Sequence, residues 1–357
     1  MKIKRALFIL ILIVLFVICL TKMNESYDDL GRYQFELTEE ERKLVLDQFS
    51  TEDINYLVEQ QIEPKQFLPY LLVDGFDLSN TKMYNIAYRV QPESKEFIVN
   101  FINKYRSHLS YKTIEDVLSH YSYNLLMRFF DEGDGFLENP TLLPNPTDLL
   151  AHLESSQTLY HYEPTDLVSI NDLPHRAIET GNDILVRKEV VKPLHALANA
   201  MKEIEDAPFG NMEIIAAYLS FENQYILYDI SKERFGDDID VYWDVPGRNE
   251  YQLGYTIQLS PKEDKKKDDK KDDKKENKDD KKEKDQKKKN NEKREQAVWL
   301  QENAYKYGFV IRYPKDKLEV TGKEYQPYTL RYVGQDLAKY MYDHNLTIEE
   351  VNLQDME

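Results

Sequence analysis

The chain has 357 residues, of which 41% are hydrophobic and 12% aromatic, a composition typical of globular rather than disordered proteins. Its formal net charge of −18 at pH 7 argues against nucleic acid as a partner, because phosphate binding needs a net basic face. Cys19 is the only cysteine, so the rest of the chain has no disulfide and no thiolate nucleophile or metal ligand.

The N-terminus has the pattern of an export signal. Three basic residues among the first five precede an uncharged apolar block from Ala6 to Leu20. No small-residue cleavage site follows, and Ile18 stands where a lipobox before Cys19 needs a small side chain. We therefore predict an uncleaved transmembrane helix within residues 1–24, whose shortness would make the flanking lysines reach to the interfaces. The basic residues place the N-terminus in the cytoplasm and the remainder of the chain outside the cell.

Residues 25–155 are predicted to form an α-helical region. Oxygen side chains three residues before a carboxylate indicate capping boxes. Apolar residues then recur at helical spacing, and we interpret them as core. The acidic segment 131–136 lacks the alternating ligands and closing Glu of a calcium loop, so we predict an acidic turn there. The three pairs with capping-box spacing are Thr38 with Glu41, Ser50 with Asp53 and Thr113 with Asp116.

Three prolines between residues 140 and 146 break the chain before a second region, which we place at residues 156–357. Within it, residues 262–295 consist almost wholly of Lys, Asp and Glu. Such a segment has no residue able to join a core, so we predict a disordered, charged insertion in a surface connection. Its length costs little stability, because loop-closure entropy grows only logarithmically.

Several stretches of the second region resemble, in order, the motifs of the VanY-type D-alanyl-D-alanine carboxypeptidases. Residues 246–258 match the family's Pro-Gly-x-Ser-x-His-x-x-Gly-x-Ala-x-Asp, and residues 326–334 match its Glu-Pro-Trp-His-x-Arg-Tyr-Val-Gly. Residues 216–220 stand where the family has Ser-Gly-Tyr-Arg-Ser. Further similar stretches are residues 162–168, 190–201 and 299–322.

The resemblance implies an α+β fold, in which helices pack on a small antiparallel sheet (a LAS or D,D-carboxypeptidase-like core). Active members hold a zinc ion on two imidazoles and one carboxylate and leave one position open for water. A Glu acts as the general base, and an Arg stabilises charge in the transition state.

Every one of these family roles falls on a different residue type in this chain. Tyr251 stands for the first His, Gln258 for the Asp and Thr329 for the second His. Gln326 stands for the general base and Leu219 for the Arg.

These replacements predict the loss of the chemistry. A phenol with a pKa near 10, a neutral amide and a hydroxyl offer zinc no imidazole or anionic donor at neutral pH. An amide cannot serve as a general base, and Leu219 removes a positive charge from the site. We therefore predict no cofactor and a pseudoenzyme. Side chains that could line the former substrate groove are Tyr218, Ser220, Gln224, Tyr328 and Arg331.

Two other site hypotheses are weaker. A metal site built elsewhere would need other histidines, and these show no close ligand spacing. A metal-free hydrolase using Ser220 would need a base beside it, and the sequence indicates none. The histidines are His108, His120, His152, His161, His175, His195 and His344.

Three functions remain open at this point. The first is a membrane-anchored, extracytoplasmic module that binds peptidoglycan stem peptides or a cell-envelope protein. The second is an active D-Ala-D-Ala carboxypeptidase with non-standard site residues. The third is a structural partner in a membrane complex.

Overall fold

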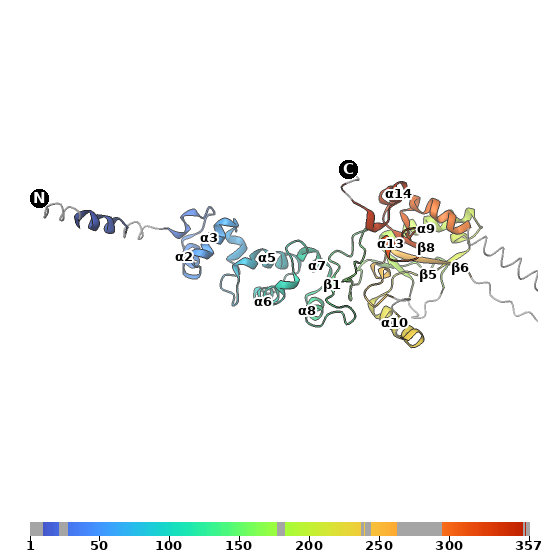
Figure 1. Cartoon of the computed structure of the whole chain (residues 1–357), viewed down its shortest axis with the longest axis horizontal. Helices are drawn as coiled ribbons and strands as arrows, with labels where there is room; N and C mark the ends of the chain where they lie inside the picture. Colours follow the sequence, from blue (N-terminus) through green and yellow to red (C-terminus); the bar gives the residue numbers. More distant parts are fainter. Residues whose placement is uncertain are drawn as a thin grey trace, which may run out of the picture. The chain divides into compact units, whose positions relative to one another are not determined.

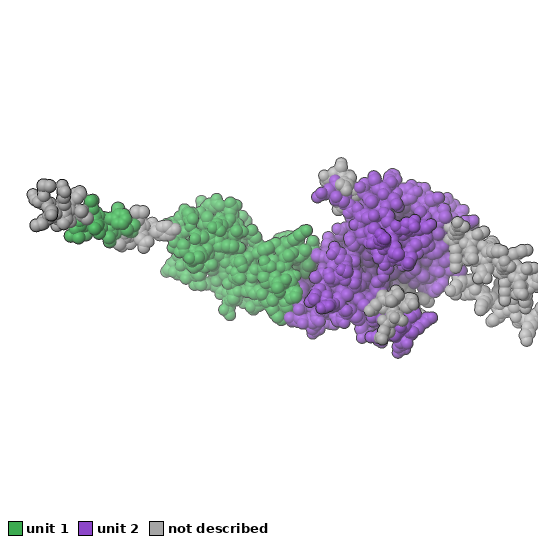
Figure 2. Space-filling model, in the orientation of Figure 1, with its two compact units in different colours: residues 1–119 green, residues 120–357 purple. Residues whose placement is uncertain are grey.

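The computed structural model describes residues 10–20, 28–176, 183–236, 239, 244–262, 295–352 and 354. The chain divides into two compact units, residues 1–119 and 120–357 (Figures 1 and 2). Residues 10–20 are helical. Among the described residues, no helix is both long and apolar enough to cross a membrane. The remainder of the predicted anchor, residues 1–9 and 21–24, lies outside the described residues.

The first unit is helical, as the caps and apolar spacing predict. Its helices are α2 (Glu39–Gln48), α3 (Thr51–Glu59), α4 (Pro64–Phe67), α5 (Thr81–Val90), α6 (Lys95–Tyr105) and α7 (Ile114–His120), with 3-10 turns η1 (Asp29–Arg32), η2 (Leu78–Asn80) and η3 (Arg106–His108). The capping boxes predicted at Thr38 and Ser50 are both formed. Each satisfies backbone N–H groups that would otherwise lack a partner at the start of a helix.

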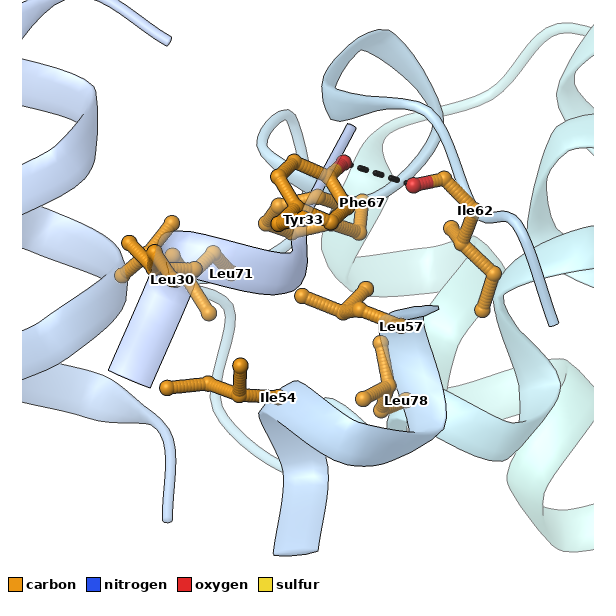
Figure 3. Close-up of a cluster of buried hydrophobic side chains, with 9 residues drawn as sticks. Leu30, Tyr33, Ile54, Leu57, Ile62, Phe67, Leu71 and Leu78 are labelled. Atoms are coloured by element: carbon orange, nitrogen blue, oxygen red, sulfur yellow. Dashed lines mark hydrogen bonds between the residues drawn. The ribbon is translucent and has the colours of Figure 1, made fainter. Parts of the chain in front are cut away.

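The N-terminal half of this unit packs around one apolar cluster (Figure 3). Side chains from η1, α3, α4 and the connecting loops meet there, and Leu57 and Phe67 are fully buried. The hydroxyl of Tyr33 donates to the carbonyl of Ile62 at 2.6 Å, so this polar group is satisfied inside the cluster.

The second unit is built on a four-stranded antiparallel sheet in the order β5-β6-β8-β7, which confirms the predicted small sheet with helices. Its strands are β5 (Met212–Ala216), β6 (Thr256–Pro261), β7 (Phe309–Tyr313) and β8 (Gln326–Tyr332). Two further pairs are β1 (Thr141–Leu142) with β2 (Gln157–Thr158), parallel, and β3 (Leu167–Ser169) with β4 (Leu185–Arg187), antiparallel.

Helices and short 3-10 turns complete the second unit (Figure 1). Its helices include α8 (Tyr123–Glu132), α9 (Lys188–Ala200), α10 (Phe221–Phe235), α13 (Leu318–Thr321) and α14 (Gln335–His344), and residues 295–303 are also helical. The 3-10 turns are η4 (Met201–Glu203), η5 (Pro208–Gly210), η7 (Glu250–Leu253), η8 (Ala304–Tyr307) and η9 (Ile348–Glu350).

Residues 120–155 belong to the second unit, whereas the sequence placed the boundary at 155/156. The physical reason is a set of hydrogen bonds from the sheet to this segment. The guanidinium of Arg331 donates to the carbonyl of Ala151 at 2.8 Å, and the hydroxyl of Tyr255 donates to the backbone carbonyl of Thr147 at 3.1 Å. Of the predicted insertion 262–295, residues 263–294 lie outside the described residues.

Candidate functional site

The short turn η7 presents the first of the replaced ligand positions. It follows Gly247, whose φ of +84° is strained for other residues and where a Cβ would lie 2.5 Å from Thr158 Oγ1. The N–H of Gly247 donates to Gln224 Oε1 at 2.9 Å, and Gln224 Nε2 donates to Gln252 Oε1 at 2.8 Å. A buried amide network therefore fixes the backbone on both sides of Tyr251.

Four of the five replaced positions meet in space. The phenol of Tyr251 donates to Gln258 Oε1 at 3.3 Å, and the hydroxyl of Thr329 donates to Gln326 Oε1 at 2.8 Å. Gln258 on β6 and Thr329 on β8 are direct cross-strand partners, which joins the two pairs. We call Tyr251, Gln258, Thr329 and Gln326 the neutral cluster.

The neutral cluster carries no charge near neutral pH. Burial raises the pKa of the Tyr251 phenol well above its usual value of 10, although a hydrogen bond with Thr329 acts in the opposite direction. Thr329 is 1% exposed. The other two members are amides, which do not ionise.

Leu219 lies beyond the end of β5, three residues after Ala216, which pairs with Gln258 across the sheet. Its side chain is half-buried, and its carbonyl accepts from Gln224 Nε2 at 3.0 Å. No guanidinium can act from this position.

Of the five predicted groove residues, two are buried in the scaffold and three are half-buried. Gln224 is 4% exposed with its amide fully engaged in the network above, and Arg331 is 0% exposed. Both are scaffold residues, so their prediction as groove residues is corrected. Ser220 caps α10 by accepting from the N–H of Asn223 at 3.2 Å. Tyr218 and Tyr328 are half-buried, and burial raises the pKa of each phenol.

Sequence analysis missed a buried ionic cluster directly beside the neutral one. Arg312 on β7 donates to both carboxylate oxygens of Glu250 at 2.7 Å and to Glu349 at 2.7 Å. Arg331 approaches Glu250 at 3.3 Å. Burial would raise the pKa of Glu250, but the two guanidinium groups outweigh it and lower the pKa. A charged residue inside the apolar stretch of β7 was the available signal, because buried Arg is almost always paired.

A polar cavity of about 470 Å³ opens over this ionic cluster. Glu250 and Arg312 contribute charged groups to its lining, and Phe136 and Val245 contribute apolar side chains. At its edge, Lys323 Nζ and Asp244 Oδ1 form an ion pair at 2.6 Å. The cavity adjoins the neutral cluster, because Glu250 precedes Tyr251 and the lining residue Tyr313 pairs with Gln326 across β7 and β8.

Comparison with known proteins identifies the family. Residues 183–335 match the family model described as VanY, D-alanyl-D-alanine carboxypeptidase. The chain is also 32% identical over 213 residues to the putative carboxypeptidase YodJ of Bacillus subtilis strain 168, a match that covers 58% of this chain and 68% of that protein. The chain belongs to the VanY-type D-alanyl-D-alanine carboxypeptidase family.

Two solved structures are also similar to this chain. The LdcB LD-carboxypeptidase, whose structure is described as revealing the molecular basis of peptidoglycan recognition, is 28% identical with a TM-score of 0.44, covering 60% of this chain and 90% of LdcB. A vancomycin-resistance D,D-pentapeptidase VanY, solved in complex with Zn(II), is 21% identical with a TM-score of 0.39, covering 56% of this chain and 97% of that one.

The residues of the neutral cluster do not fit a catalytic zinc ion. The cluster offers a phenol that stays protonated, two amides and a hydroxyl, whereas catalytic zinc sites use His, Cys and carboxylate. Within the described ranges, no group of three or more His, Cys, Asp or Glu side chains is placed to hold a metal ion. We therefore assign no metal-dependent reaction step to these residues.

Proposed function

We propose that this chain is a catalytically inactive member of the family, which binds peptidoglycan stem peptides beside its former active site. The observation that carries the proposal is the neutral cluster. Its four side chains form two hydrogen-bonded pairs at the positions that we assign to the family's ligands and base. The stem-peptide ligand follows from family membership, and the adjoining cavity offers it space.

Metal content and peptidase activity test the loss of chemistry directly. Purified full-length protein is expected to contain much less than one zinc per chain and to leave peptides ending in D-Ala-D-Ala intact. One zinc per chain, together with chelator-sensitive release of D-Ala, would establish the second hypothesis, an active carboxypeptidase with non-standard residues.

Restoring the ligands tests the positions themselves. Tyr251→His in η7, Gln258→Asp on β6 and Thr329→His on β8 would together supply the donors of a family site. We expect the triple variant to bind zinc measurably more tightly than the parent. Turnover should stay low, because Gln326 cannot act as a general base and Leu219 supplies no positive charge. The matched control is Tyr251→Phe, Gln258→Leu and Thr329→Val, which changes the same positions without adding a donor. Equal zinc affinity of the two folded variants would reject the assignment of these positions to one site.

We also propose that residues 1–24 anchor the chain in the membrane with the second unit outside the cell. The uncharged block from Ala6 to Leu20 after a basic N-terminus supports this. Protease added to intact cells should degrade the second unit, and removal of residues 1–24 should release it from the membrane fraction. Persistence of the truncated chain on membranes would instead favour the third hypothesis, a structural partner of a membrane complex.

A further inference from the structure

The cavity beside the neutral cluster carries balanced charges of both signs. Three cations and three anions line it. A ligand with a single net charge would therefore meet one opposite group and one like group at close range, whereas a ligand with both charges could satisfy both. The cations are Arg248, Arg312 and Lys323, and the anions are Asp244, Glu250 and Glu349.

Most of these charges are already committed to the scaffold. Arg312 is 3% exposed and is held by two carboxylates, Glu250 and Glu349, each at 2.7 Å. Separating such a buried pair leaves an uncompensated charge and is strongly unfavourable. The guanidinium of Arg248 donates to the carbonyls of Ser155 at 2.8 Å and Glu154 at 3.2 Å.

Lys323 and Asp244 differ from the others because their pair is open to solvent. Their side chains are 41% and 36% exposed, and Nζ lies 2.6 Å from Oδ1. Exposed ion pairs contribute little to stability, so this one can be opened at small cost. The backbone that carries Lys323 is held in place, because its N–H donates to Thr321 Oγ1 at 3.3 Å.

We infer that the cavity binds an amino-acid unit whose side chain ends in both a free ammonium and a free carboxylate, by exchange with the Lys323–Asp244 pair. The ligand's carboxylate accepts from Lys323 Nζ, and its ammonium donates to Asp244. The exchange leaves no charge unpaired, and the apolar side chains Phe136 and Val245 face the methylene groups of the ligand. This inference rests on the proposed function, because it names the residue of the stem peptide that the cavity would select.

The size of the cavity is consistent with such a ligand. About 470 Å³ lies within the range of small-ligand sites, and it exceeds the volume of one amino-acid residue, so adjoining parts of a peptide can enter. The lining residues Glu250, Arg312 and Glu349 are already paired with one another, so we expect them to need no reorganisation on binding.

The test uses full-length protein and four synthetic stem tripeptides in isothermal titration calorimetry. The first carries a side chain ending in a free amine and a free carboxylate. In the second the amine is acetylated, in the third the carboxylate is amidated, and in the fourth the side chain ends in an amine alone. We expect the first to bind at least about tenfold more tightly than each of the others, the effect of losing one charged hydrogen bond.

Single substitutions test which side chains cause the preference for the first peptide. Lys323→Met should weaken binding of the first peptide about tenfold and abolish its advantage over the amidated peptide, while Asp244→Asn should abolish its advantage over the acetylated one. Lys317→Met is the matched control, because Lys317 forms a similar pair with Glu350 at 2.8 Å but does not line the cavity. It should leave all four affinities unchanged.

The possible outcomes separate the two proposals. Equal binding of all four peptides, or a Lys323→Met variant that binds like the parent, overturns the inference and leaves the proposed stem-peptide binding intact. Binding of none of the four overturns both. Unaltered thermal unfolding of each variant establishes that a lost affinity comes from the lost charge.

Discussion

Two neighbouring residues of η7, Glu250 and Tyr251, belong to clusters of opposite character. Glu250 lies in a buried network of full charges with Arg312, Arg331 and Glu349. Tyr251 lies among neutral side chains that satisfy one another by hydrogen bonds. The ionic cluster joins η7 to β7 and β8, and the neutral cluster joins η7 to β6 and β8. Only the ionic cluster depends on the pairing of opposite charges.

The difference explains how the fold would persist if the family's chemistry is lost, as we propose. A catalytic centre built from a metal ion and charged ligands would leave unpaired charges once one ligand was lost. Here the ligand positions hold side chains that need no ion, while the ionic cluster beside them ties η7, β7, β8 and η9 together. The ionic network and the neutral cluster thus depend on different side chains of the same short turn.

The largest effect should follow from breaking the ionic cluster. Arg312→Met leaves Glu349 without this partner and Glu250 with Arg331 as its remaining guanidinium. Removing one partner of a buried ion pair costs about 3–5 kcal/mol, so we expect a loss of that order in the free energy of unfolding of the second unit. Denaturant unfolding measures it.

The control for this prediction is an exposed ion pair in the same unit. Lys339 and Asp343 are paired at 2.5 Å with side chains 61% and 45% exposed. Because solvent screens this exposed pair, Lys339→Met should leave the free energy of unfolding nearly unchanged. A similar loss in both variants would show that the buried position of Arg312 is not what matters.

The sequence predicted the α+β class and the helical first region, and it supplied the hypothesis that five site positions are replaced. It could do so because caps, apolar spacing and family motifs are local patterns. It could not predict that Gln224 and Arg331 are buried, since both bond to residues far away in the chain, such as Gly247 and Ala151. The same holds for the cavity, where Asp244 and Lys323 are brought together by the fold alone.

A smaller loss should follow from a side chain at Gly247, which positions the turn shared by both clusters. In Gly247→Ala the left-handed backbone should lower the free energy of unfolding by about 1–2 kcal/mol. Overlap with Thr158, whose Oγ1 would lie 2.5 Å from the new Cβ, should lower it by about 1–3 kcal/mol more. Gly322→Ala is the control, since its φ is +67° but nothing lies within 4 Å. Only the backbone cost should appear there, and equal losses would contradict the role of close packing.

The ionic cluster should also make stability depend on pH. The folded pKa of Glu250 lies below its usual value of 4.5, so its contribution is fully present above about pH 4.5 and is lost as the pH falls through the folded pKa. Glu250→Gln should therefore be less stable than the parent at pH 7, and the gap should narrow as the pH falls below about 4.5. Unfolding free energies measured between pH 7 and pH 3 test this, and a constant gap would rule out Glu250 as the titrating group.

The smallest effect should come from the neutral cluster itself. Tyr251→Phe removes one neutral hydrogen bond, which at 3.3 Å to Gln258 is a long one. The amide of Gln258 is half-buried and can turn to another partner, so we expect a loss of about 1 kcal/mol or less. Binding of stem peptides should not change, because Tyr251 does not line the cavity. If Tyr251→Phe instead destabilised the second unit as much as Arg312→Met, the two clusters would carry the fold equally, and the separation of scaffold from former active site would fail.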